Sequence, residues 1–267
     1  MSVHVAFLVG ASPSSASVLH AIAAELRTAG GEATLHESPY EPELLRAHVV
    51  GLRGLDLATL GTARRLETLG GRCCNTVAAT ALARDKTATE NALRAGNVPR
   101  PITVTLASWE EVRSLAAAGS VVVKPFAGSR GAGVVDGGPG GGSLPKREPF
   151  PGPFVVQDRV DGDGIDRKLY VVGETVRGVL RGWPPETLAA KRGTPFEPNE
   201  KERGLALATG RALGLELYGV DVLYGRDGPV VVDVNAFPGY KGVPGAAGLL
   251  VRHLTQAARQ REVACAS

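Results

Sequence analysis

The stretch VVVDVNAFPGY, residues 230–240, ends an apolar run in two polar side chains and a turn. Its leading valines are β-branched and favour a buried strand. Because successive side chains of a strand point to opposite faces, Asp233 and Asn235 lie on one face, with Val234 on the other. An apolar strand rarely holds an unpaired acid, so this arrangement predicts a binding role for Asp233 and Asn235.

A second acidic strand precedes this stretch. Asp221 lies within the strand predicted for residues 218–223, and the turn predicted at 225–228 joins the two strands as a hairpin. Asp221 and Asp233 then face each other across the ladder, where two carboxylates repel unless a cation accompanies them. Mg²⁺ is a suitable cation because it prefers oxygen ligands. The alternative is structural, with Asp233 capping a turn and Asp221 paired with an arginine.

A glycine-rich loop follows another predicted strand in VVVKPFAGSRGAGV, residues 121–134. Glycine lets backbone N–H groups approach a phosphate closely, and Lys124 and Arg130 add positive charge. The loop lacks the Gly-Lys-Ser/Thr ending of a P-loop and the GxGxxG spacing of a Rossmann fingerprint. Taken alone, it is equally consistent with a glycine-rich hairpin that binds nothing.

Composition narrows the class of protein. The 267 residues are 43% hydrophobic and 21% charged, which is typical of a soluble globular protein, and the net charge of +3 is too balanced to favour nucleic acid as a partner. No apolar run approaches ~18 residues, so no membrane partner is expected. The three cysteines (Cys73, Cys74 and Cys265) suit a reduced cytoplasmic protein, and the five histidines share no motif.

The pattern of predicted helices and strands changes after residue 74. Residues 1–74 alternate strands, expected at 3–10, 32–36 and 49–52, with helices expected at 14–29 and 57–69. This alternation predicts a small parallel sheet. From Asn75 onward we expect helices capped by Asn75, Asp85 and Ser108, a loop over 136–149, and further strands and helices up to a final helix at 245–261.

Four segments of the chain, in the order in which they follow one another, resemble the sequence motifs of the ATP-grasp superfamily and, within it, of the RimK-like carboxylate–amine ligases. They are residues 75–103, 121–134, 154–176 and 213–242. The resemblance implies an α/β fold of the α+β ATP-grasp type. In it, an N-terminal domain with a small parallel sheet (1–74) precedes two α+β subdomains (75–153 and 154–267) that clasp ATP.

The resemblance also implies roles for individual residues. The nucleotide would be bound by Lys86, Lys124, the loop residues Gly128, Ser129, Arg130 and Gly131, the hinge residues Gln157, Asp158 and Val160, and Asp163 or Asp161 at the ribose. Lys168 and Arg181 would act on the transferred phosphate, and Asp221, Asp233 and Asn235 would bind the metal. The alternative for Lys86, Lys168 and Arg181 is an ordinary solvated side chain.

The implied reaction joins a small-molecule carboxylate to an amine through an acyl phosphate, with ATP and Mg²⁺ as cofactors and Mn²⁺ as an alternative metal. A homodimer is the default expectation for association. Residues 182–200 lack the Asn-rich stretch expected of a glutamate-adding ligase, and Lys191, Arg192, Tyr240 and Lys241 are candidate carboxylate binders. Two other functions stay open: a small-molecule kinase of the inositol polyphosphate type, and a non-catalytic nucleotide-binding module.

Overall fold

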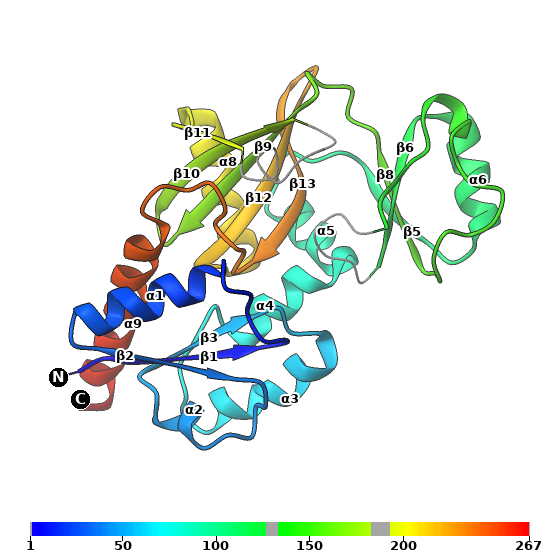
Figure 1. Ribbon diagram of the computed structural model, residues 1–267. Helices are drawn as coiled ribbons and strands as arrows, with labels where there is room; N and C mark the ends of the chain where they lie inside the picture. Colours follow the sequence, from blue (N-terminus) through cyan, green and yellow to red (C-terminus); the bar gives the residue numbers. More distant parts are fainter. Residues whose placement is uncertain (1, 127–132, 183–192, 267) are drawn as a thin grey trace.

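The computed structural model describes residues 2–126, 133–182 and 193–266, with side chains of the last helix described up to residue 260. Within these ranges the chain forms three sheets, each covered by helices (Figure 1). We name the sheets by their order along the chain: the N-terminal sheet (within residues 4–74), the middle sheet (within 103–158) and the third sheet (within 165–236). In the view of Figure 1 the middle sheet stands beside the third sheet, and the N-terminal sheet lies below the third sheet.

The N-terminal sheet is parallel, as its alternating pattern predicts. Its strands are β1 (His4–Val9), β2 (Glu32–His36), β3 (Val49–Arg53) and β4 (Cys73–Cys74), in the order β2-β1-β3-β4. The connecting helices are α1 (Val18–Thr28), α2 (Glu43–Arg46) and α3 (Leu57–Thr68). Ser17 and Asp56 cap α1 and α3 by accepting backbone N–H groups. Strand β4 and helix α2 were not predicted, because they are too short to show a periodic pattern.

Asn75 does not cap a helix, contrary to the sequence-based expectation. Thr76 caps α4 (Val77–Arg84), and Asp85 caps α5 (Lys86–Ala95) as expected. Asn75 is fully buried, and its Oδ1 accepts the backbone N–H groups of Glu216 and Leu217 at 2.7 Å each, while its Nδ2 donates to the Leu217 carbonyl at 2.7 Å. One side chain therefore joins the end of the N-terminal domain to the third sheet.

The middle sheet is antiparallel in the order β5-β8-β6-β7. Its strands are β5 (Thr103–Leu106), β6 (Val121–Pro125), β7 (Val135–Asp136) and β8 (Phe154–Asp158). Helix α6 (Trp109–Ala118), which begins with a capping box at Ser108, covers it, and the short 3-10 turn Pro139–Gly141 lies in the expected loop. Since β8 pairs with β5 and β6, the subdomain boundary expected at residue 153 comes before a strand that belongs to the middle sheet.

The third sheet carries the acidic hairpin. Its antiparallel strands are β9 (Ile165–Val172), β10 (Thr175–Gly182), β11 (Thr194–Phe196), β12 (Leu217–Gly225) and β13 (Gly228–Ala236), in the order β11-β10-β9-β12-β13. Helix α8 (Glu200–Leu213) begins with a capping box at Asn199 and ends at Gly214, whose φ of 67° suits glycine.

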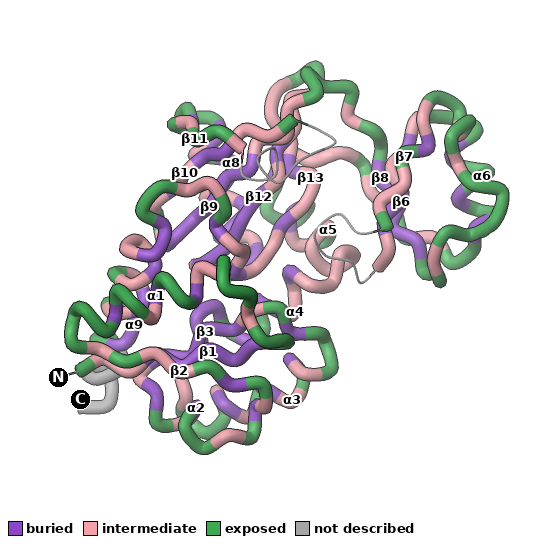
Figure 2. The backbone as a smooth tube through the Cα atoms, in the orientation of Figure 1, coloured by how far each residue is buried: buried purple, intermediate pink, exposed green. Residues whose placement is uncertain are grey.

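The two faces of the third sheet have different neighbours. Leu169, Val171 and Val220 pack on one face against α8 and against α4 and α5, so these two helices belong structurally with the third sheet. Tyr170 and Val172 pack on the other face, in a cluster that includes residues of α1 and of α9 (Ala246–Ala266). In Figure 2 buried backbone runs through the centre of the third sheet and through β1 and β3. Among the described residues, no helix combines the length and apolar character needed to span a membrane.

Replacing Asn75 by alanine is expected to lower the free energy of unfolding by about 2 kcal/mol or more, because the N–H groups of Glu216 and Leu217 lose their partner, whereas the Leu217 carbonyl still accepts the N–H of Phe237 at 2.7 Å. Chemical denaturation of Asn75→Ala checks this. Asn91→Ala, an exposed change on α5, is the control and should shift stability by less than about 0.5 kcal/mol. Equal effects of the two substitutions would contradict the proposed importance of the Asn75 contacts.

Candidate functional site

Asp221 and Asp233 face each other across the β12–β13 ladder, which confirms the predicted hairpin. On the other side of β12, Asp221 lies opposite Lys168 of β9. The β12–β13 register shifts after Asp221, so that Val222 pairs with Val231 and Val232 is left as the extra residue of a bulge. The bulge leaves the carbonyl of Val232 free of the ladder beside Asp233.

Each carboxylate is neutralised by a lysine from another element. Lys86 at the start of α5 donates from Nζ to Asp233 Oδ1 at 2.7 Å, and Lys168 donates from Nζ to Asp221 Oδ1 at 2.5 Å. The Lys86 and Lys168 side chains are only 17% and 10% exposed, so neither is an ordinary solvated residue. Asn235 Nδ2 lies 3.3 Å from Asp233 Oδ2, on the same face of the hairpin.

Surrounding lysines control the protonation of Asp233. Burial alone would raise the pKa of this carboxyl, but Lys86 and Lys124 outweigh burial and hold its pKa at about 2. For Lys168, burial works toward a lower pKa, but the adjacent Asp221 reverses the direction and the pKa is raised. Both groups are therefore charged at neutral pH, which suits a site for a cation and an anion together.

Lys124 connects the middle and third sheets. Its Nζ donates to Gln157 Oε1 on β8 at 2.7 Å and to the bulge carbonyl of Val232 at 2.8 Å. Gln157 in turn donates from Nε2 to Thr103 Oγ1 at 3.1 Å. Burial lowers the pKa of Lys124 to about 8. A cleft opens at this junction, and its lining includes Lys86, Thr103, Lys124, Gln157 and Asp233.

The predicted hinge runs from Gln157 at the end of β8 toward β9. Asp158 is exposed at the end of the strand, and Val160 lies within van der Waals reach of the β12–β13 turn. Of the two candidate ribose ligands, Asp163 accepts from Arg167 Nη2 at 2.6 Å and Asp161 pairs with Arg159. The Gln157 side chain belongs to the Lys124 network, which leaves its backbone role at the hinge a prediction.

Arg181 lies on β10 directly opposite Asp166 of β9. Its Nη2 donates to the Tyr170 hydroxyl at 2.6 Å, and Tyr170 stacks against Tyr240 with ring centroids 5.3 Å apart. Asp166 and Tyr170 were not among the predicted site residues. Both share a face with Lys168 by strand alternation, and that signal could have identified them.

Several predicted residues are not joined to this group. Gly128, Ser129, Arg130, Gly131, Lys191 and Arg192 lie outside the described residues. Tyr240 is not a carboxylate binder, because it is only 3% exposed and its hydroxyl donates to the Val171 carbonyl at 2.9 Å. Lys241 is exposed and stays a candidate.

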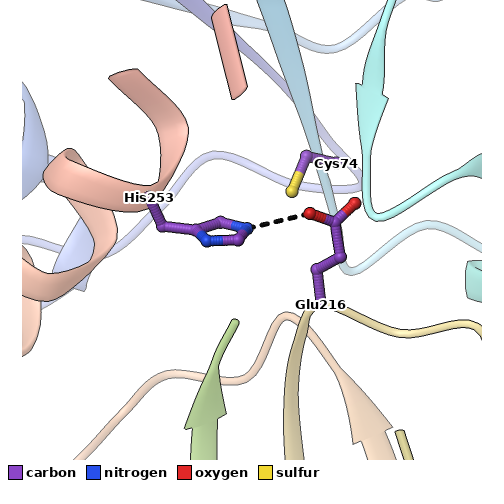
Figure 3. A group of neighbouring side chains, drawn as sticks. All are labelled: Cys74, Glu216 and His253. Atoms are coloured by element: carbon purple, nitrogen blue, oxygen red, sulfur yellow. Dashed lines mark hydrogen bonds and ion pairs between the residues drawn. The ribbon is translucent and has the colours of Figure 1, made fainter. Parts of the chain in front are cut away.

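A second polar cluster lies where the N-terminal domain meets α9. Figure 3 shows His253 and Glu216 pointing toward each other, with an Nε2–Oε2 distance of 3.0 Å, and Cys74 beside them. The hydrogen bond from His253 lowers the pKa of Glu216, and burial raises the pKa of the Cys74 thiol. These three donor atoms lie within 4.8 Å of one another, but burial disfavours the thiolate that a metal ligand requires. His253 thus has a structural contact that the sequence pattern did not reveal.

Comparisons with known proteins indicate the family of the chain. Residues 191–256 match the family described as the inositol 1,3,4-trisphosphate 5/6-kinase ATP-grasp domain. A protein of Xanthomonas oryzae pv. oryzae named "Probable alpha-L-glutamate ligase" is 32% identical over 227 residues, which cover 78% of this chain and 77% of that protein.

Two solved structures share the fold. A RimK-domain ATP-grasp protein from Sphaerobacter thermophilus has a TM-score of 0.72 at 22% identity, covering 94% of this chain and 99% of the other. The ATP-grasp ligase PsnB, complexed with a minimal precursor, Mg and ADP, has a TM-score of 0.70 at 20% identity, covering 96% and 97%.

The lowered pKa of Lys124 predicts a pH dependence of stability. The folded pKa of about 8 lies below the ordinary value of 10.5, so between these pH values the unfolded chain binds the extra proton and stability rises with pH. Compared with Lys124→Met, the wild-type protein should therefore gain unfolding free energy as pH rises from 8 toward 10.5. Denaturation across this range checks the difference.

The control for this measurement is Lys201→Met, an exposed change on α8. The unfolding free energy of this variant should change with pH in the same way as that of the wild-type protein. If the unfolding free energy of Lys124→Met has the same pH dependence as the wild-type protein, burial does not lower the pKa of Lys124. The contact between the two sheets is then weaker than its geometry indicates.

Proposed function

The chain belongs to the RimK-like family of ATP-grasp carboxylate–amine ligases, and from this premise we propose how its residues divide the work of forming an amide bond. The observation that carries the proposal is the gathering of Asp221, Asp233, Lys168 and Arg181 on one face of the third sheet. Lysines from α5 and from the middle sheet complete the group.

ATP would bind in the cleft between the middle and third sheets. Lys86 and Lys124 bind its phosphates, and the loop containing Gly128, Ser129, Arg130 and Gly131 covers them. The segment comprising Gln157, Asp158 and Val160 would bind adenine through its backbone, and Asp163 or Asp161 would bind the ribose. The buried cations of the cleft support this proposal, because phosphate is the anion that offsets their desolvation.

ATP-grasp ligases use ATP and Mg²⁺, and the donor chemistry of this chain fits that metal. Asp221, Asp233 and Asn235 offer hard oxygen ligands from one hairpin, the type that Mg²⁺ prefers. In the structure Lys86 and Lys168 are the cations beside these two carboxylates, and a bound metal would share the two acids with them. When bound, Mg²⁺ supplies charge neutralisation for the transferred phosphate. Mn²⁺, which takes the same oxygen donors, is the alternative.

The reaction then needs positioning and charge stabilisation rather than a protein nucleophile. The substrate carboxylate attacks the γ-phosphorus of ATP, giving an acyl phosphate and ADP. Lys168 and Arg181 stabilise the charge on the transferred phosphoryl oxygens. The amine attacks the acyl carbon, and inorganic phosphate leaves with the electrons of the broken C–O bond. The glycine-rich loop excludes water that would hydrolyse the acyl phosphate.

Amino acids, peptides and specialised metabolites are the substrate classes we propose. The relative from Xanthomonas is named as a glutamate ligase, and PsnB is described with a precursor peptide, so both free amino acids and peptides are reasonable starting points. Lys241 is our candidate carboxylate binder. We further propose a cytoplasmic protein, consistent with reduced, buried Cys73 and Cys74, and association as a homodimer.

The second candidate is a small-molecule kinase, favoured by the family match over residues 191–256. A kinase transfers phosphate to a hydroxyl and needs no amine, so acceptor dependence separates the two activities. We expect ADP release that requires Mg²⁺, a carboxylate and an amine, measured over a panel of amino acids and small carboxylates with L-glutamate as the first acceptor. ADP release with a polyol and without an amine would replace the ligase proposal by the kinase.

Asp233→Asn tests the metal assignment. Loss of one carboxylate charge should lower ADP release by roughly 10²-fold or more, because phosphate charge is then less well neutralised. The melting temperature is measured in parallel to show that the variant folds. Asp227→Asn, the same change at the exposed turn between β12 and β13, should keep wild-type activity. A fully active Asp233→Asn variant would refute the assignment.

A further inference from the structure

Asp166 is an acid of the site face that the proposed roles do not use. It lies on β9, directly opposite Arg181 on β10, and two residues before Lys168. Strand alternation puts Asp166, Lys168 and Arg181 on one face, because opposite residues of a ladder project the same way. The Asp166 carboxylate therefore lies on the face that carries the residues proposed to bind the transferred phosphate.

Asp166 differs from the neighbouring acids because, within the part of the chain that the structure describes, its side chain has no hydrogen-bond or ion-pair partner. Asp221 is paired with Lys168, Asp233 with Lys86, and Asp163 with Arg167. Over the described ranges, neither a hydrogen bond nor an ion pair reaches the Asp166 side chain, although it is partly buried. Close by, the buried Nε of Arg181 also has no hydrogen-bond partner among these residues. A buried polar group without a partner is costly, and in a binding site the ligand commonly supplies the partner.

The electrostatic surroundings indicate that the absent partner is a cation. Burial first, and then the charge of Asp221, raise the pKa of Asp166 to about 7, while Lys168 and Arg181 act in the opposite direction and Asp233 adds to the rise. The two basic residues on its face have other partners among the described residues, since Lys168 pairs with Asp221 and Arg181 donates to the Tyr170 hydroxyl. A bound cation would favour the ionised carboxylate and relieve this cost.

Two kinds of cation are candidates for the partner of Asp166: a metal ion and a protonated amine. The acids proposed to bind the metal lie on β12 and β13, whereas Asp166 lies opposite Arg181, and that guanidinium opposes a divalent cation more strongly than a single ammonium charge. The amine substrate must reach the carbon of the acyl phosphate, whose phosphate oxygens would be bound by Lys168 and Arg181. A carboxylate on that same face is in the right place to receive it.

We propose that Asp166 binds the ammonium group of the acceptor substrate and takes the proton that this group must lose before it attacks the acyl phosphate. The proposal rests on the proposed ligase function. The carboxylate accepts one proton from R–NH₃⁺, which leaves R–NH₂ with a free electron pair. This pair forms the C–N bond, the acyl C–O bond breaks, and inorganic phosphate leaves with its electrons and takes up the second proton of the amine. The acceptor is therefore a cationic primary amine rather than a neutral nucleophile.

The test compares two acceptors in Asp166→Asn. The carboxylate and amino acid that support wild-type ADP release are used first, and then the amino acid is replaced by hydroxylamine, which is uncharged at neutral pH and needs no base. Amide formation with the amino acid should fall by roughly 10²-fold or more. Hydroxamate formation should stay at the wild-type rate, since carboxylate activation does not use Asp166. The exposed Asp227→Asn variant is the matched control and should match the wild type in both assays.

Two further readouts separate this role from a structural or metal-binding one. Removing a partly buried, unpaired charge should leave the melting temperature unchanged or higher, whereas a lower value would mean that Asp166 supports the fold. The Mg²⁺ concentration for half-maximal hydroxamate formation should not change. An equal loss in both assays, or a changed Mg²⁺ requirement, would overturn the assignment of Asp166 alone. A wild-type protein that releases no ADP with any carboxylate would overturn the ligase function and this inference together.

Discussion

Two carboxylates, Asp221 and Asp233, face each other across one ladder of a largely buried sheet, and their mutual repulsion must be offset for this sheet to fold. The chain offsets it with lysines from separate parts of the sequence, Lys168 on the neighbouring strand and Lys86 at the start of α5. Each contact costs desolvation of both partners, which favourable pairing recovers only in part. The result is a folded site in which opposite charges are already arranged at short distance. Such a site is suited to a ligand that brings both negative phosphates and a positive metal.

The site therefore depends on the packing of all three sheets. Lys86 reaches Asp233 because α4 and α5 pack on the third sheet, although they precede the middle sheet in sequence. Lys124 comes from the middle sheet itself. Asn75 joins the N-terminal domain to the first residues of β12, the same strand that carries Asp221. Changes at the domain junction are thus connected to the acidic pair through a single strand.

The acidic hairpin could be predicted from the sequence because every signal for it is local. The alternation of Asp233 and Asn235 and the turn before β13 lie within about twenty residues. Asn75 was misassigned because its three partners are more than 140 residues away, and a local capping pattern competes with them. The sheet to which β8 belongs could not be predicted from the sequence either, since strand pairing depends on the packing of the whole middle sheet. For Asp166, alternation with Lys168 indicates the face of the strand, but the lack of a hydrogen-bond or ion-pair partner among the described residues is a property of the folded structure that the sequence does not show.

The contact between Lys124 and the bulge carbonyl of Val232 has a consequence for association between molecules. Strand β13 is the outer strand of the third sheet, and an outer strand exposes backbone groups that can pair with another chain. Lys124 occupies the carbonyl of Val232, and the carbonyl of Pro99 accepts the N–H of Val231 at 2.9 Å. The contact that joins the two sheets at the cleft and the contact from Pro99 thus occupy outward-facing backbone groups at the bulge, where another chain would otherwise pair with this edge.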